Sequence, residues 1–210
     1  MARLIIDRNM RRSRALLTAV LFTTATATGA PAQSPAVPST NTPVIAIETE
    51  AGTIRVELDP QHAPATVANF LRYVNEHFFD GTAFYRAVTL DNQPTNPIKI
   101  EVIQGGANDS KQTYPPIALE RTSVTRIKHT DGTISMARNG PDTATSEFFI
   151  CIGDQPALDE GGLRNPDGQG FAAFGHVVAG MDIVRRIQHA PVQGQMLTPP
   201  VVITRMSRVQ

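Results

Sequence analysis

Short apolar runs separated by turn residues divide the chain from Val44 onward into segments of strand length. In residues 54–58, three apolar side chains alternate with Arg55 and Glu57, a period that places one set on each face of a strand. The 16 prolines and 15 glycines favour short strands joined by turns over a helix bundle. Further strand-like runs occur at 44–48, 84–88, 100–104, 133–136, 148–151, 171–178 and 201–206. The pattern predicts a mainly β domain of about eight strands.

Two segments show helical spacing instead. Pro64 suits a first helical turn, and apolar residues then recur at 67, 70, 71 and 74 on one face. After Gly180, apolar residues recur at 181, 184 and 187. We therefore expect two helices in a domain that is otherwise built of strands.

Residues 135–151 form the most distinctive stretch of the chain. Two short apolar segments flank Asn139-Gly140-Pro141-Asp142, where glycine permits positive φ and proline fixes its own φ, as turns require. A lone strand–turn–strand is most often plain β-core. Two other segments precede this one, however: Phe84-Tyr85-Arg86, and Val102 to Gly106, which reads Val-Ile-Gln-Gly-Gly.

In this order, the three segments resemble the cyclophilin family of peptidyl-prolyl isomerases, and the resemblance covers nearly the whole chain from Val44 onward. It implies a closed antiparallel eight-stranded barrel capped by two α-helices. It also implies the reaction, which is cis–trans rotation about the peptide bond that precedes a proline.

Arg86 matches the catalytic arginine of the family. Rotation about an amide has a barrier of roughly 18–20 kcal/mol, because the nitrogen lone pair is shared with the carbonyl group. A guanidinium that donates toward the prolyl nitrogen lowers this barrier without a covalent intermediate, and it is always charged. For an isolated arginine in a strand, a surface ion pair is the alternative.

The resemblance also implies a set of substrate-binding residues. Gln104 and the main chain at Ala137 and Arg138 would hydrogen-bond the substrate backbone, whereas Phe149 and Leu158 would line an apolar pocket for the proline ring. Core packing remains the alternative for the last two. The full predicted substrate-binding set is Gln104, Val102, Ala137, Arg138, Glu147, Phe149, Leu158 and Phe171.

Some positions depart from the family pattern. Glu101 stands where the family has a pocket phenylalanine, and Ala157 stands where a tryptophan is common. A carboxylate beside the proline ring would weaken apolar burial and could pair with Arg86. Residues 89–99 form an insertion that could instead shift the register and place Ile100 at that wall. The sequence leaves both possibilities open.

Composition argues against several other classes of function. The 19 basic and 19 acidic residues give a net charge of zero, which argues against nucleic acid as a partner. The five histidines are scattered without metal-ligand spacing, so we expect no metal and no cofactor. The single cysteine, Cys151, follows an aromatic pair and is expected to be a buried, unreactive residue.

The first 32 residues have the features of a signal peptide. A basic start precedes a short apolar run at 15–23, and Ala30-Pro31-Ala32 offers small residues for cleavage. The run is too short for a permanent membrane anchor, because a span takes about 20 residues. We expect a linker at 33–43, an isomerase domain at 44–210, and a periplasmic monomer that acts on proline-containing peptides and on unfolded or folding proteins.

A second function is compatible with the same scaffold. The protein could bind proline-containing segments with little or no catalysis, as a periplasmic chaperone or assembly factor. Glu101 favours this alternative, whereas Arg86 together with Gln104 favours an enzyme.

Overall fold

The structure is a computed structural model in which residues 42–108 and 110–209 are described. The predicted signal peptide at 1–32 lies outside these residues, as do residues 33–41 of the predicted linker.

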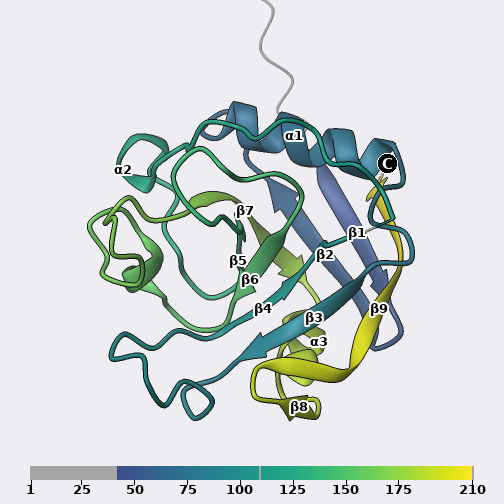
Figure 1. Ribbon diagram of the computed structural model, residues 1–210. Helices are drawn as coiled ribbons and strands as arrows, with labels where there is room; N and C mark the ends of the chain where they lie inside the picture. Colours follow the sequence, from purple (N-terminus) through teal and green to yellow (C-terminus); the bar gives the residue numbers. More distant parts are fainter. Residues whose placement is uncertain (1–41, 109, 210) are drawn as a thin grey trace, which may run out of the picture. The chain divides into compact units, whose positions relative to one another are not determined.

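The strands form a closed antiparallel barrel (Figure 1). The order around it is β1-β2-β7-β5-β6-β4-β3-β9, and pairing between β9 and β1 closes the ring, which confirms the predicted eight-stranded barrel. A two-residue strand, β8, extends the sheet beside β9. The strands are β1 Val44–Thr49, β2 Gly52–Leu58, β3 Ala83–Val88, β4 Val102–Gly105, β5 Thr133–Met136, β6 Phe148–Cys151, β7 Ala172–Ala179, β8 Val192–Gln193 and β9 Met196–Val209.

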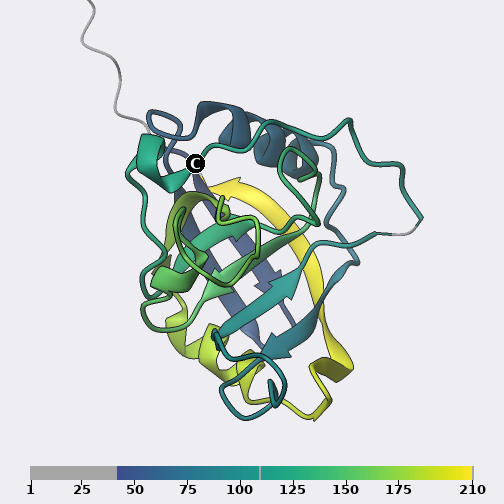
Figure 2. The same cartoon turned by 60° about the vertical axis from the view of Figure 1, so that its left-hand side comes forward.

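Two helices cover the ends of the barrel. Helix α1 (Pro64–Asn75) crosses one end and α3 (Met181–Gln188) lies at the other, as the two views show (Figures 1 and 2). Both confirm the helical spacing in the sequence. Helix α2 (Thr122–Thr125) was not predicted, because four residues are too few to show a period. No helix in the described part of the chain is long and apolar enough to cross a membrane.

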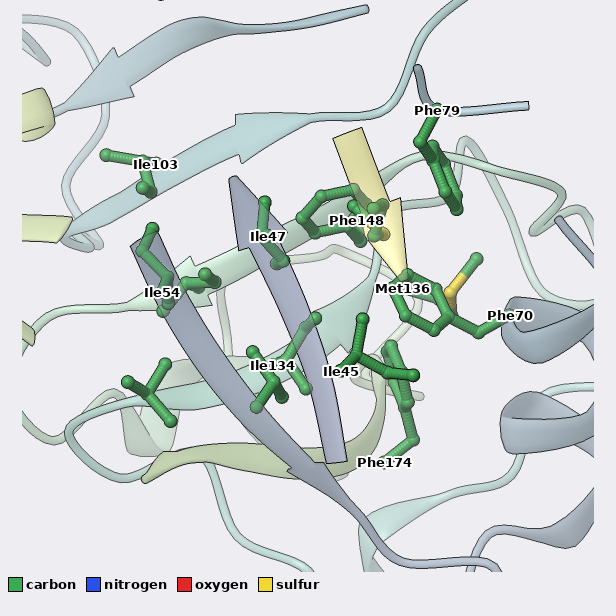
Figure 3. Packing of buried hydrophobic residues seen from close by; sticks show 14 of the residues in the cluster. Ile45, Ile47, Ile54, Phe70, Phe79, Ile103, Ile134, Met136, Phe148 and Phe174 are labelled. Atoms are coloured by element: carbon green, nitrogen blue, oxygen red, sulfur yellow. The ribbon is translucent and has the colours of Figure 1, made fainter. Parts of the chain in front are cut away.

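Apolar side chains fill the interior of the barrel (Figure 3). Phe70 of α1 reaches into it and contacts Phe148 of β6 and Phe174 of β7, with ring centroids 5.6 Å and 5.1 Å away. Such offset and edge-to-face contacts stabilise a core beyond the burial of area alone. The helix is thus fixed to the barrel by the face that its sequence period predicts.

A second apolar cluster lies on the outer face of β4 and β6. Strand alternation turns Ile103 and Phe148 into the barrel, whereas Val102, Phe149 and Cys151 turn outward. Cys151 is fully buried in this outer cluster, and burial raises the pKa of its thiol far above the ordinary value. Its predicted burial is confirmed. The rest of the cluster is Val88, Ile100 and Leu158, with Ala137, Ala157 and Phe171 packed against it.

Candidate active site

A cavity of about 260 Å³ opens over this outer cluster. Of the predicted site residues, all except Glu147 line it. The complete lining is Arg86, Ile100, Val102, Gln104, Ala137, Arg138, Asn139, Phe149, Leu158, Arg164, Asn165 and Phe171.

One wall of the cavity is apolar and rigid. Val102, Phe149 and Leu158 are each at most 4% exposed. The Phe149 ring has Phe171 edge-on at 5.3 Å and the His129 ring stacked against it at 6.0 Å, so its orientation is fixed. A small apolar ring would find a dry, preformed surface here.

Arg86 projects over the cavity from β3, directly opposite Gln104 on β4. Its Nη1 donates to Oε1 of Gln104 at 2.8 Å, while Nε and Nη2 donate to Oε1 of Gln195 at 2.9 and 2.6 Å. Three of its five N–H groups are therefore held, which leaves one on each Nη for a substrate. Burial lowers the pKa of Arg86, and the nearby Glu147 carboxylate opposes this shift. An arginine nevertheless stays charged, so the site holds an oriented, partly desolvated cation.

Glu147 lies behind Gln104 and not in the cavity lining. Its Oε2 accepts hydrogen bonds from Nε2 of Gln104 at 2.8 Å and from the hydroxyl of Tyr85 at 2.6 Å. Burial raises the pKa of Tyr85, and the hydrogen bond to the carboxylate raises it further, so the phenol stays protonated as a donor. Glu147 also lines a neighbouring hollow with Ala83, Tyr85, Ala107 and Pro200. In this geometry it orients Gln104 and does not line the proposed proline site.

Sequence reasoning missed Gln195, which lies 109 positions from Arg86. Its amide Nε2 donates to the main-chain carbonyl of Asn92 at 3.0 Å, and this directs its Oε1 at the guanidinium. Asn92 belongs to the 89–99 insertion and is itself tied to Ala87 at 2.9 Å. The insertion therefore supports the arginine from behind.

The structure resolves which residue stands at the wall. Ile100 lines the cavity and is 6% exposed, whereas Glu101 is outside it. The Glu101 carboxylate accepts a hydrogen bond from Gln188 of α3 at 3.3 Å. Val102 and Gln104 share the outer side of β4, because side chains alternate, and Ile100, just before the strand, packs in the same outer cluster as Val102. The possibility that Glu101 faces the proline site is therefore wrong, and Ile100 takes the place.

Arg138 ties a loop over the cavity. Its guanidinium forms two hydrogen bonds to Asp167, at 2.7 and 2.9 Å, and lies 5.1 Å from the centre of the Phe171 ring. The N–H of Ala137 donates to the carbonyl of Glu147, so a substrate could use only the Ala137 carbonyl for a main-chain bond. Both residues line the cavity, and their main-chain bonds to a substrate stay a prediction.

Ser135, His129 and Asp159 form a chain of hydrogen bonds behind Phe149. His129 Nε2 is 2.9 Å from the Ser135 hydroxyl, and its Nδ1 is 2.8 Å from Asp159. Serine, histidine and aspartate are linked in the same order as in a catalytic triad, where the histidine acts as the base for the serine nucleophile. Here, however, Ser135 and His129 are only 0% and 1% exposed. A substrate cannot reach that hydroxyl, so we assign the chain of bonds a structural role.

Comparisons with known proteins agree with this geometry. Residues 44–208 match the family model described as cyclophilin type peptidyl-prolyl cis-trans isomerase. Peptidyl-prolyl cis-trans isomerase A of Dickeya dadantii is 38% identical over 165 residues, which cover 76% of this chain and 78% of that protein. Peptidyl-prolyl cis-trans isomerase B of Escherichia coli is 35% identical over 150 residues, or 69% of this chain and 84% of that one.

Solved structures share the fold. A crystal structure of a cyclophilin type peptidyl-prolyl cis-trans isomerase from Cryptosporidium parvum has a TM-score of 0.66 at 20% identity, and the match covers 80% of this chain and 98% of that chain. A crystal structure of the same protein in the presence of the dipeptide Ala-Pro has a TM-score of 0.64, also at 20% identity, over 80% of this chain and 99% of that chain.

Proposed function

This chain belongs to the cyclophilin-type peptidyl-prolyl cis-trans isomerases and is an enzyme of that class; we propose that Arg86 is its catalytic residue. The observation that carries the proposal is the three-point hold on the Arg86 guanidinium beside an apolar wall. Neither Arg86 nor the groups that hold it are nucleophiles, and rotation about the peptide C–N bond requires none.

The proposed mechanism follows from the electronic structure of the amide. The proline ring packs on Val102, Phe149 and Leu158, so the peptide bond before it lies beneath Arg86. As the bond twists, its nitrogen becomes pyramidal and its lone pair localises, and a free N–H of Arg86 donates to it. A donor that is already oriented needs no rearrangement at that moment.

The proposed substrates are proline-containing peptides and unfolded or folding proteins. A related structure was solved in the presence of Ala-Pro, which supports a proline residue as the group bound in this cavity. The competing hypothesis, a binder with little catalysis, drew its support from Glu101, and that side chain lies outside the cavity.

Cis–trans exchange of a short Ala-Pro peptide, measured by NMR in the presence of the protein, tests this proposal. Catalysed exchange in the wild type that is largely lost in Arg86→Ala supports it. Equal catalysis by the two proteins would make Arg86 structural, and binding without faster exchange would favour the binder.

We also propose that the enzyme acts in the periplasm. The support is the basic start, the short apolar run and Ala30-Pro31-Ala32 in the sequence. The intact mass of protein recovered from the periplasm of a Gram-negative host should correspond to a chain that begins at Gln33. A full-length species retained in the cytoplasm would contradict this.

A further inference from the structure

The cavity carries an excess of positive charge. Three arginines line it, Arg86, Arg138 and Arg164, and its lining contains no aspartate or glutamate. Clefts lined by charges of one sign concentrate the field and attract groups of the opposite sign. The charge of the lining therefore favours substrates that carry a negatively charged group.

Among the residues that the structure describes, only one of the three arginines forms an ion pair. Arg138 forms an ion pair with Asp167, whose pKa is lowered to about 2 by the hydrogen bonds from that arginine. Within residues 42–108 and 110–209, no carboxylate lies at ion-pairing distance from Arg86 or Arg164. Glu147 acts on Arg86 through Gln104 and not by direct contact.

Arg164 is held in place at the edge of the cavity. Its Nη1 donates to Oε1 of Gln93 at 2.9 Å and to the carbonyl of Ile98 at 2.6 Å, both in the 89–99 insertion. Its main-chain N–H bonds to the carbonyl of Ala157 at 3.2 Å. The two side-chain bonds use only Nη1 of the guanidinium, so Nε and Nη2 can donate to a bound anion.

Arg164 and Arg86 act on each other. Burial lowers the pKa of Arg164, and the positive charge of Arg86 lowers it further. An anion bound between two such cations relieves their repulsion as well as forming its own contacts. Hydrogen bonds from a guanidinium to an anion are stronger than those between neutral groups.

We propose that Arg164 makes this isomerase selective for prolines that have an acidic side chain, glutamate or aspartate, on a neighbouring residue. The inference rests on the proposed function, because it assumes that the proline ring packs on the apolar wall beneath Arg86. Arg164 lines the same cavity of about 260 Å³ as Arg86 and the apolar wall, which puts it within the reach of residues next to the bound proline.

Two series of short peptides test the proposal. In one, the residue before the proline is Glu, Gln or Lys; in the other, the residue after it varies in the same way. We expect the Glu peptide of at least one series to exceed its Gln counterpart in kcat/KM by roughly three- to tenfold, with Lys below Gln. This preference should shrink as salt is raised from low to about 0.5 M, because salt screens charges that are partly exposed. Equal rates for Glu and Gln in both series, or a preference for Lys, would overturn the proposal.

Variants assign the preference to one side chain. Arg164→Gln keeps a donor for Ile98 but removes the charge, so the Glu/Gln ratio should fall toward one, whereas Arg164→Lys should keep part of it. Arg185→Gln makes the same change of net charge on α3, where Arg185 pairs with Asp131, and should leave the ratio as in the wild type. A ratio that survives in Arg164→Gln would overturn the assignment. Should thermal melting show that this variant is unfolded, the salt dependence of the wild-type ratio decides instead.

Failure of the proposed function has a different signature. If the protein accelerates exchange in none of the peptides, the catalytic role is wrong, and the dissociation constants of the same peptides test the charge preference. Tighter binding of Glu than of Gln peptides supports the role of Arg164, whereas equal binding overturns it.

Discussion

Nε2 of Gln104 lies 2.8 Å from Oε2 of Glu147, and this contact fixes which way the Gln104 amide faces. With its nitrogen committed to the carboxylate, the amide presents its oxygen to Arg86. The hydrogen bonds thus run from an anion through a neutral amide to the cation above the proposed proline site. Chains of this kind are mutually polarised, so each member holds the next in place.

Replacing Glu147 should loosen that arrangement. In Glu147→Ala, the Gln104 amide is free to turn, and we expect kcat to fall about tenfold, or ~1.4 kcal/mol, with a smaller change in KM. Glu147→Gln retains an acceptor oxygen and is the matched control, expected to stay close to the wild type. Steady-state kinetics on an Ala-Pro peptide separate the two. A kcat of Glu147→Ala equal to that of the wild type would mean that the contact between Glu147 and Gln104 is not needed to position Arg86.

Arg86→Ala should remove most of the catalysis and leave the fold intact. Loss of one preorganised donor typically costs about 10²–10³ in rate, or roughly 3–4 kcal/mol. Arg86→Lys should rescue little, because an ammonium group lacks the planar fork that engages Gln104 and Gln195 together. Exchange rates measured by NMR, with circular dichroism for the fold, provide the readout. Arg55→Ala, on the exposed face of β2, is the control and should match the wild type.

Gln195→Ala tests the support that comes from the insertion. Arg86 loses the acceptor of two of its three hydrogen bonds, so we expect kcat to fall about tenfold while KM changes less. Gln193→Ala, at an exposed position two residues away, should have no effect. A loss that appeared only in KM would place Gln195 in substrate binding, not in the positioning of the arginine.

Alanine variants of the neighbours Ile100 and Glu101 should differ in their effect on kcat/KM. Ile100→Ala removes apolar surface from the wall and should lower kcat/KM about tenfold, or ~1.4 kcal/mol of lost contact. Glu101→Ala should stay within about twofold of the wild type, because Gln188 keeps a second acceptor in the carbonyl of Val88. Peptide kinetics on both variants decide. The opposite ranking would show that the carboxylate faces the substrate.

Stability should fall on acidification because of His129. Burial lowers the pKa of this histidine, so the unfolded chain takes up a proton at a higher pH than the folded protein does. Below about pH 6.5, the free energy of unfolding should therefore decrease by up to ~1.4 kcal/mol per pH unit. Burial alone raises the pKa of Asp159, but its hydrogen bonds with His129 outweigh this and lower it, which adds a further loss near pH 4.

Urea unfolding at pH 8, 6 and 5 measures this effect. His129→Gln should be less stable at pH 8 and should lose the limb between pH 6.5 and 5. His176→Gln removes an exposed histidine of β7 and should keep the wild-type pH profile. An unchanged profile in His129→Gln would exclude His129 as the source.

The sequence by itself determined the strands and two of the helices, because a two-residue period gives the strands and a period near four gives α1 and α3. The closed barrel and the proposed site residues came from the resemblance to the cyclophilins. Alternation places Val102 and Gln104 on one side of β4, but the insertion at 89–99 left the position of Glu101 open until the structure placed it outside the cavity. Arg86, Gln104 and Phe149 lie on paired strands, and it was the family resemblance of their motifs that indicated one common site.

Only the tertiary structure decided how the arginine is held and which charges accompany it. Gln195 and Arg164 are distant in sequence from Arg86 and lie in loops, where no period marks a partner. Gln195 reaches Arg86 because closure of the barrel brings β9 beside β3, and Arg164 is held at the same cavity by hydrogen bonds to the 89–99 insertion. Side-chain hydrogen bonds across such loops depend on the final position of every backbone segment involved. A linear pattern does not record that, and so it did not show that Glu147, predicted as a substrate-binding residue, lies outside the cavity lining and contacts Gln104.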